Sequence, residues 1–148
     1  MIRRIEKTEI VNGLYLEMIK NVEEINVDDI YYTMQYVWIE NNLYPYAIKN
    51  EEGKHIGYVF LEQTDTHVIY VKFIEICEQY KGEGFGTTVV QSIFEWFDIN
   101  FLEGTILDDG HLCAYYFWLS LGAEIDCIMN EYDEPDFDGE VSFVLKKE

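Results

Sequence analysis

The sequence predicts a mixed fold of the α/β type, more closely α+β, with elements in the order β-α-α-β-β-β-α-β-α-β-β. Two patterns predict it. Three strand-like runs in the middle of the chain are separated only by short turn signals, as in an antiparallel meander, and apolar residues recur with helical spacing on both sides of that meander. At 148 residues, of which 49% are hydrophobic, the chain can bury one substantial core. We therefore expect residues 1–148 to form a single domain.

The first half of the chain is predicted to hold a first strand, two helices and the meander. Turn signals at Asn50–Gly53 and at Thr64-Asp65 divide the meander into strands. Apolar residues at i, i+3, i+4 and i+7 predict both helices, and Asp28 is the expected N-cap of the second. The expected strands are residues 2–5, 44–49, 55–63 and 66–76, and the expected helices are residues 11–25 and 30–38.

The second half of the chain begins with a glycine-rich turn that opens a helix. A further helix at 112–121 is expected to end at Gly122, because glycine is favoured just after a helix C-terminus. The apolar face of the first of these helices is expected to be Val89, Val90, Ile93, Phe94 and Phe97. The remaining strands are predicted at 102–107, 125–129 and 141–146, the last two around an acidic loop at 131–139.

The balance of charge is strongly negative, with 29 acidic against 10 basic residues and a formal net charge of −19. Such a surface repels nucleic acid and anionic lipid, whereas it attracts a cationic substrate. The same acidity can instead serve solubility alone, and the sequence does not decide between the two roles. We therefore expect no nucleic-acid partner and no membrane partner.

Targeting segments and cysteine chemistry also limit the class of protein. No apolar run approaches the roughly 20 residues that a membrane-spanning helix needs, and residues 1–10 lack the apolar stretch of a signal peptide. We therefore expect a cytoplasmic protein. Cys77, Cys113 and Cys127 fall on segments predicted to be buried and lack the CxxC spacing of metal sites, so we expect reduced structural thiols and no bound metal.

An apolar strand runs into a glycine-rich turn over residues 73–87, and this pattern indicates an anion-binding loop. Backbone N–H groups at the start of a helix lack intrahelical partners and carry the positive end of the helix dipole, so they hold a phosphate without a dedicated side chain. A Walker A loop would need Lys and then Ser or Thr after its last glycine, whereas Lys81 comes before the glycines. The dinucleotide fingerprint also fails, because it needs Gly or Ala where Thr87 stands.

Two motifs in order resemble the GCN5-related N-acetyltransferase (GNAT) family. Lys81-Gly82-Glu83-Gly84-Phe85-Gly86 is similar to the acetyl-CoA loop of that family, Arg/Gln-x-x-Gly-x-Gly/Ala, with Lys in the first place. Further along, residues 111–123 keep the spacing of the family segment Asn-x-x-Ala-x-x-Phe-Tyr-x-x-x-Gly-Phe. Three side chains depart from that segment: His111 stands for Asn, Trp118 for Tyr and Ala123 for Phe.

The resemblance implies a central mixed, mostly antiparallel sheet of about seven strands with helices on both faces. It also implies that an acetyl group passes from acetyl-CoA, the co-substrate, to an amine by direct attack in a ternary complex. A backbone N–H around Ile76 would stabilise the thioester oxygen, while the pantetheine arm pairs with the same strand edge. The residues expected to contact the cofactor are Ile74, Ile76, Lys81, Gly82, Glu83, Gly84, Phe85, Gly86, Thr87, His111, Ala114 and Trp118.

Glu75 is the first candidate for the general base that removes a proton from the amine. It lies between two isoleucines in a strand expected to be central and covered on both faces, where desolvation would raise the pKa of its carboxyl group toward neutrality. Glu75 can instead bind only substrate or water. His67 and Asp108 or Asp109 are the other candidates.

The resemblance further implies that a tyrosine at the position of Trp118 would protonate the leaving thiolate. An indole N–H cannot do this at neutral pH. Tyr116 is the expected substitute, with Tyr115 or solvent as alternatives, so the expected catalytic residues are Glu75 and Tyr116.

No motif identifies the acceptor amine, which can be a small molecule or a peptide. Asp28-Asp29 and the loop Tyr132 to Asp138 are candidate rims for a cationic group, or else solvated surface. The sequence leaves a homodimer open, and it leaves open another acyl-CoA as the donor. A non-catalytic CoA-binding regulator or interaction module of the same fold is the alternative to an enzyme.

Overall fold

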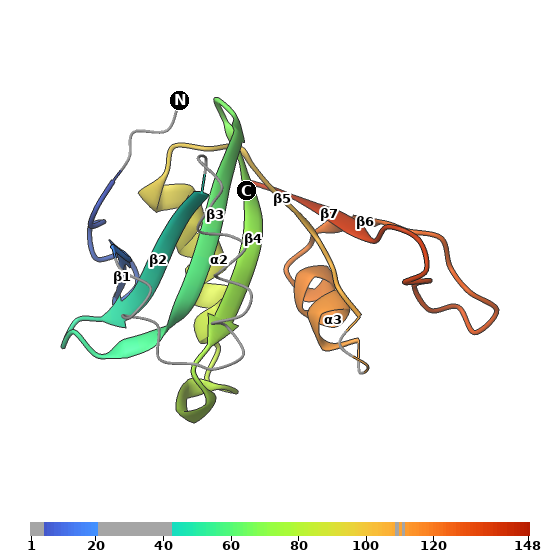
Figure 1. Ribbon diagram of the computed structural model, residues 1–148, viewed down its shortest axis with the longest axis horizontal. Helices are drawn as coiled ribbons and strands as arrows, with labels where there is room; N and C mark the ends of the chain where they lie inside the picture. The colour runs from blue at the N-terminus through green and yellow to red at the C-terminus, as the bar shows by residue number, and fades with distance from the viewer. Residues whose placement is uncertain (1–4, 21–42, 109, 111) are drawn as a thin grey trace.

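The computed structural model describes residues 5–20, 43–108, 110 and 112–148, and its centre is a seven-stranded sheet (Figure 1). Neighbouring strands follow the order β1-β2-β3-β4-β5-β7-β6, and every pair is antiparallel except β4 with β5. This confirms the mixed, mostly antiparallel sheet and the α+β class. The strands are β1 (Leu14–Met18), β2 (Leu43–Asn50), β3 (His55–Asp65), β4 (Val68–Ile76), β5 (Phe101–Thr105), β6 (Glu124–Asp126) and β7 (Ser142–Lys146).

Two α-helices and one short 3-10 helix accompany the sheet in the described residues: α2 (Phe85–Trp96), α3 (Cys113–Ser120) and η2 (Glu78–Tyr80). The apolar face predicted for α2 is confirmed, since all five of its side chains are buried in the main core. Trp118 of α3 belongs to the same core. Several predicted features lie outside the described residues: residues 2–4 of the first strand, residues 21–25 of the first predicted helix, the cap at Asp28 and the helix at 30–38. Helices on the second face of the sheet therefore stay a prediction.

A helix was predicted over residues 11–25, but residues 14–18 form strand β1. Asn12 and Gly13 adopt positive φ angles of 52° and 79°, and the residues that flank them exchange main-chain hydrogen bonds of 2.8 and 3.0 Å. This is the two-residue turn that joins twisted hairpin strands, and Asn-Gly is its favoured sequence. Leu14, Leu16 and Met18 are buried alternately, with the period of a strand. The prediction was wrong because some of these residues also fit helical spacing, and the turn decides between the two.

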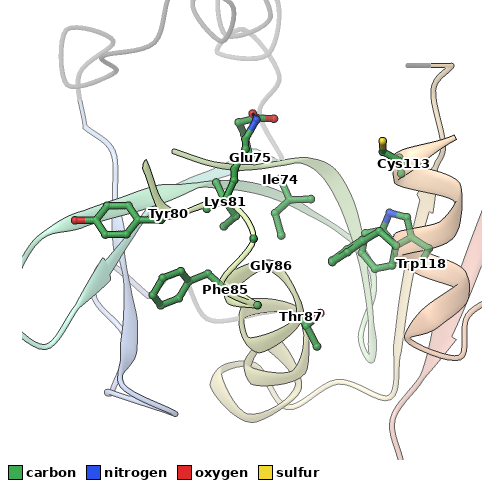
Figure 2. Close-up of a pocket in the computed structure, with 14 residues that line it drawn as sticks. Ile74, Glu75, Tyr80, Lys81, Phe85, Gly86, Thr87, Cys113 and Trp118 are labelled. Carbon is green, nitrogen blue, oxygen red and sulfur yellow. Dashed lines mark ion pairs between the residues drawn. The ribbon is translucent and has the colours of Figure 1, made fainter. Parts of the chain in front are cut away.

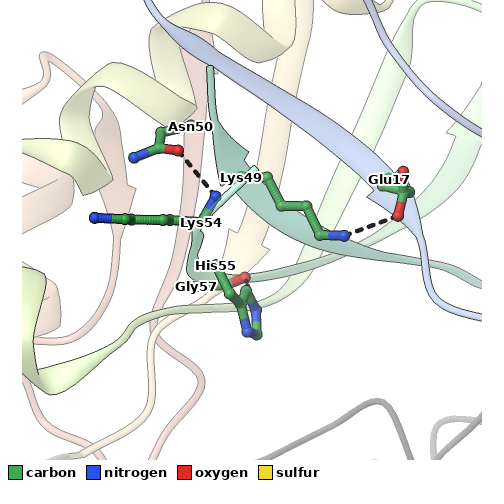
Figure 3. Close-up of polar contacts among 6 residues, drawn as sticks. All are labelled: Glu17, Lys49, Asn50, Lys54, His55 and Gly57. Atoms are coloured by element: carbon green, nitrogen blue, oxygen red, sulfur yellow. Dashed lines mark hydrogen bonds and ion pairs between the residues drawn. The ribbon is translucent and has the colours of Figure 1, made fainter. Parts of the chain in front are cut away.

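The β2–β3 turn and a cross-strand ion pair order one end of the sheet (Figure 3). Asn50 Oδ1 accepts the main-chain N–H of Lys54 at 2.9 Å, which confirms the predicted turn at Asn50–Gly53. Lys49 Nζ on β2 lies 2.8 Å from Glu17 Oε1 on β1. That hydrogen bond is the largest cause of a lowered pKa at Glu17. The ion pair thus joins β1 to β2, and the turn joins β2 to β3.

Strand β4 contains one residue, Lys72, that β3 does not match. The β3 partners of Val71 and Phe73 are adjacent, so Lys72 forms a β-bulge. Because side chains alternate with a period of two, the extra residue reverses the faces: Val71 before the bulge and Ile74 after it both join the main core, whereas Phe73 packs against a second apolar cluster. By the same alternation Glu75 faces the side of that second cluster.

The parallel strands β4 and β5 stay together over only part of their length. Their pairing ends at Val71↔Gly104, beside the bulge, and the rest of β4 pairs with β3 up to Gly57↔Ile76. Figure 1 shows β5 leaving β4 and running toward α3 and β7. One edge of β4 therefore lacks a strand partner beyond Val71 within the described sheet.

Trp118 of α3 holds that helix against the diverging strands. Its indole stacks on the ring of Phe143 in β7, with ring centroids 3.8 Å apart and planes 17° from parallel. A Cβ on Gly104 of β5 would lie 2.4 Å from the Phe143 ring, so the absence of a side chain there makes room for the stack. The stacking of α3 on β7 thus depends on the glycine that pairs with Phe143 across the sheet, Gly104↔Phe143.

The described residues contain no helix long and apolar enough to cross a membrane. The three cysteines are thiols rather than disulfides. Cys77 and Cys127 are partly buried, but Cys113 is exposed at the start of α3, so the prediction that all three lie on buried segments was wrong for Cys113. The position of Cys113 makes it relevant to the site described below.

At Gly57 the main chain of β4 leaves no room for a side chain on β3. A Cβ at this position would lie 2.3 Å from the carbonyl oxygen of Glu75 and 3.0 Å from Cα of Ile76. His55 donates from Nε2 to the Gly57 carbonyl at 2.7 Å (Figure 3), and burial lowers the pKa of its imidazole. Glycine at position 57 therefore allows the pairing that places the end of β4.

We predict that Gly57→Ala lowers the free energy of unfolding by about 1–3 kcal/mol, the usual cost of adding a methyl group to a packed site. Gly139→Ala is the matched control, because its nearest contact would be an ordinary 3.8 Å to the carbonyl oxygen of Asp136. Urea denaturation followed by circular dichroism measures both variants. Equal stability of the two would contradict the close approach of β3 and β4.

Candidate functional site

A cavity of about 410 Å³ lies beside the unpaired part of β4 (Figure 2). Its walls come from the end of β4, from the glycine-rich loop with the start of α2, and from one face of α3. The lining residues are Ile74, Glu75, Ile76, Tyr80, Lys81, Gly82, Gly84, Phe85, Gly86, Thr87, Cys113, Ala114, Phe117 and Trp118. Of the predicted cofactor residues that the structure describes, all except Glu83 therefore line this cavity.

The glycine-rich loop has the backbone geometry that the sequence predicted. Gly82 and Gly84 have positive φ angles of 83° and 84°, and a Cβ on either would meet nothing within 4 Å. Gly84 is the N-cap of α2 and its carbonyl accepts the N–H of Thr88 at 3.1 Å. The N–H groups of Phe85, Gly86 and Thr87 therefore have no partner inside the helix. The loop offers main-chain donors and open space for an anion, together with the positive end of the helix dipole.

The edge of β4 supplies a second row of main-chain groups. Beyond Val71 this edge has lost β5, while the other edge stays paired with β3. Alternate N–H and C=O groups between the bulge and Ile76 are therefore available to an extended ligand, as in strand addition. Ile74 and Ile76 add apolar wall on the cavity side. A long ligand can thus lie along β4 with its anionic end at the loop.

Lys81 meets two carboxylates at the mouth of the cavity. Its Nζ lies 2.8 Å from Oε1 of Glu75 and 3.3 Å from Oε2 of Glu78, and Figure 2 shows the Glu75 and Lys81 side chains converging. The hydrogen bond with Glu75 is the main cause of a raised pKa at Lys81. Glu75 was predicted to be desolvated between covered faces, but its side chain is 38% exposed and ion-paired. The expectation was wrong because β5 leaves β4 before reaching Glu75.

One face of α3 forms the wall opposite β4. Ala114 and Trp118 are one turn apart and both line the cavity, as do Cys113 and Phe117 beside them. Trp118 is 5% exposed, so it is a fixed wall rather than a mobile side chain. The ring of Phe117 would lie 3.2 Å from a Cβ on Gly86, which shows how closely α3 approaches the loop.

Tyr116, the predicted proton donor, does not line the cavity. Its side chain is 57% exposed, on a different face of α3 from Ala114 and Trp118. Its ring packs edge-on against Tyr115, with centroids 5.3 Å apart. Two residues along a helix is about half a turn, so Tyr116 does not share the face of Trp118.

The other predicted residues lie away from the cavity or outside the description. Glu83 is exposed and does not line it, while His111 and Asp109 lie outside the described residues, as do Asp28-Asp29. His67 is exposed in the β3–β4 turn, at the far end of β4. Asp108 lines a separate hollow of about 280 Å³ with acidic residues from the predicted loop, namely Glu134, Asp136 and Asp138.

Three lining residues were not among the expected cofactor contacts: Tyr80, Cys113 and Phe117. Tyr80 ends η2 and packs edge-on against Phe85 at the start of α2, with centroids 5.8 Å apart. Cys113 and Phe117 are four residues apart, as are the predicted Ala114 and Trp118. Phe117 is also three residues after Ala114, so helical spacing that starts from the predicted Ala114 finds Phe117 and then Cys113.

A family model described as "Acetyltransferase (GNAT) family" matches residues 11–117. The matched segment includes the bulged strand, the glycine-rich loop, α2 and the first residues of α3. No curated protein matches the chain in sequence.

Solved structures of acetyltransferases share the fold. A spermidine N-acetyltransferase from Vibrio cholerae in complex with CoA and spermine matches with a TM-score of 0.62 at 12% identity, covering 93% of this chain and 97% of that one. A GNAT family acetyltransferase from Elizabethkingia anophelis with acetyl-CoA bound matches with a TM-score of 0.61 at 13% identity, covering 92% and 99%. An acetyltransferase from Thermus thermophilus matches with a TM-score of 0.58 at 12% identity, covering 82% and 75%. At these identities the likeness is one of fold.

We predict that iodoacetamide labels Cys113 faster than Cys77. Cys113 is exposed at the cavity, whereas burial raises the pKa of the Cys77 thiol and lowers the fraction of reactive thiolate. Mass spectrometry of peptides from a labelling time course measures both rates, and Cys113→Ser should remove the fast reaction. Faster labelling of Cys77 would contradict the placement of these two residues.

Proposed function

The chain belongs to the GNAT family of acetyltransferases, and we propose from this premise that it transfers an acetyl group from acetyl-CoA to a cationic amine. The observation that carries the proposal is one continuous cavity. It joins a main-chain anion site at the start of α2, an unpaired edge of β4 and a carboxylate at Glu75. These are the parts needed to hold a long phosphorylated thioester and to deprotonate an amine beside it.

The proposed position of acetyl-CoA follows from the cavity walls. The N–H groups from Gly82 to Thr87 take the diphosphate, because the open space at Gly82 and Gly84 lets a phosphate approach the main chain. The pantetheine arm runs along β4 and bonds to its free edge. Phe117 and Trp118 cover the arm from the side of α3. Acetyl-CoA is the co-substrate in this arrangement.

Glu75 is the proposed general base. Among the described residues that line the cavity, it alone carries a carboxylate. An alkylamine has a pKa of about 10.4 and is mostly ammonium at neutral pH, so a base must take its proton before the nitrogen attacks the thioester carbon. A main-chain N–H near Ile76 is proposed to donate to the carbonyl oxygen as its charge grows. The attacking nitrogen then gives its second proton to solvent, the C–S bond breaks, and the amide and the CoA thiolate remain.

Solvent is the proposed source of the proton for the leaving thiolate. Tyr116 lies outside the cavity, and the Trp118 indole cannot supply a proton at neutral pH. The thiolate of CoA is a good leaving group, so it can leave before it is protonated. The reaction therefore has one proton-transfer residue on the protein rather than an acid and base pair.

The acceptor is proposed to be a small-molecule or peptide amine that carries positive charge. The formal charge of −19 attracts cations toward the chain and is the support for this class. The solved Vibrio cholerae enzyme contains spermine, so polyamines belong in the first substrate panel, beside aminoglycosides, amino acids and peptides. We place the reaction in the cytoplasm, which agrees with three cysteines held as thiols.

We predict that Gly84→Val weakens CoA binding by at least about tenfold, because the branched side chain fills the space that a phosphate needs and strains the positive φ. Gly53→Val is the matched control, since Gly53 has a φ of 79° but lies in the β2–β3 turn, away from the cavity. Isothermal titration with CoA measures both variants. Wild-type affinity in folded Gly84→Val protein would remove the loop from the binding site.

We predict that Glu75→Gln lowers turnover at saturating acetyl-CoA by about a hundredfold, the usual loss for a general base. Tyr116→Phe is the matched control and should keep wild-type turnover, because Tyr116 does not reach the cavity. Release of CoA thiol across the amine panel measures both. Undiminished turnover in Glu75→Gln would remove Glu75 from the mechanism, and CoA binding without turnover on any amine would instead support a regulator.

A further inference from the structure

The cluster of Lys81, Glu75 and Glu78 contains one ammonium and two carboxylates within 3.3 Å of it. Lys81 and Glu75 both line the cavity, whereas Glu78 is 88% exposed outside it. The Lys81 side chain is half-exposed, and its Nζ is shared between two carboxylates rather than held by one. Its ammonium is therefore free to exchange one anionic partner for another in the same place.

The fold of the chain brings these groups together. The N–H of Cys77 donates to the Ile56 carbonyl at 2.8 Å, which anchors the end of β4 on β3. The 3-10 helix η2 then turns the chain back, with the N–H of Lys81 donating to the carbonyl of Glu78 at 3.2 Å. Lys81 is thereby returned beside Glu75 and placed next to the first glycine of the loop. One ammonium is thus held between the base and the anion site.

The two carboxylates and a diphosphate at the loop compete for the Lys81 ammonium. While Lys81 is paired with Glu75 and Glu78, the cluster carries a net negative charge and repels a phosphate that approaches the loop. A doubly charged diphosphate at the loop competes with each single carboxylate for the ammonium. When Lys81 turns to the diphosphate, Glu75 is left without its cation.

We propose that Lys81 is exchanged from Glu75 to the diphosphate when acetyl-CoA binds, so that cofactor binding releases the Glu75 carboxylate for the amine. The proposal rests on the proposed function, because it takes the loop to be the CoA site and Glu75 to be the base. Lys81 is a positioning residue in this scheme. It withholds the base in the free protein and yields it in the complex, which couples the binding of the two substrates.

The exchange makes an unusual prediction about affinity: removing the charge of Glu75 tightens CoA binding. Lys81 then no longer has to leave its strongest partner, so Glu75→Gln should lower the Kd for CoA by about two- to fivefold, the range expected from an exposed ion pair. Glu78→Gln should act in the same direction and less strongly, because Glu78 is farther from Lys81 and more exposed.

A double-mutant cycle separates this exchange from a general effect of charge. Glu83 provides the control, since it lies in the same loop, carries the same charge and is not one of the two carboxylates bound to Lys81. Isothermal titration at low salt gives the Kd for CoA in wild type, Glu75→Gln and Glu83→Gln, each with Lys81 intact and with Lys81→Met. The gain from Glu75→Gln should vanish in the Lys81→Met background, whereas any gain from Glu83→Gln should persist.

The outcomes distinguish the exchange from the proposed function. Failure of the wild type to bind CoA overturns both. Binding by the wild type with no gain in Glu75→Gln, or with a gain that survives Lys81→Met, overturns the exchange alone and leaves Glu75 and Lys81 as a permanent pair. Glu78→Gln, on an exposed side chain, gives the same test if Glu75→Gln does not fold.

Discussion

The β-bulge at Lys72 is the constraint on which the site depends, because it acts on both the face and the edge of β4. The extra residue reverses the alternation of side chains, so that Glu75 does not point into the core shared with α2. An unpaired carboxylate in that core would cost several kcal/mol. The same bulge lies beside the last pair of β4 with β5, Val71↔Gly104. One irregular residue therefore both turns the acid toward the side of the second apolar cluster and leaves a main-chain edge for a ligand.

A chain with a formal charge of −19 can still bind an anion because local geometry outweighs the distant field. At physiological salt, exposed charges more than about 8 Å apart are largely screened. Donors at the start of α2 act within hydrogen-bond range and are not weakened in this way. Lys81, the basic side chain at the loop, is already held by two carboxylates. In the proposed complex, main-chain groups rather than basic side chains are thus the main source of affinity at this loop, and long-range acidity remains available to attract a cation.

Local signals predicted the loop and α2, and local signals could also have corrected two of the features that were missed, whereas the exposure of Glu75 depends on tertiary structure. Glycines with positive φ and an apolar face of 3.6 period can be recognised in short windows, and both were found. The error at residues 14–18 was avoidable, since Asn12-Gly13 is a strong hairpin signal. Helical spacing along α3 would also have placed Tyr116 on a different face from Trp118. The exposure of Glu75 was different, because it follows from the divergence of β5, which no local pattern of β4 encodes.

The departure of Trp118 from the family pattern has a structural reason in the stack it forms. Its indole lies on Phe143, and Phe143 lies over Gly104, where no side chain intervenes. A buried ring in this stack serves as a wall of the cavity and cannot also move protons. In the proposed mechanism proton transfer is then left to Glu75, whose side chain is partly exposed and ion-paired with Lys81. A site with a single proton-transfer group can be regulated through that group alone, which is why the partner of Glu75 matters more here than it would beside a second catalytic acid.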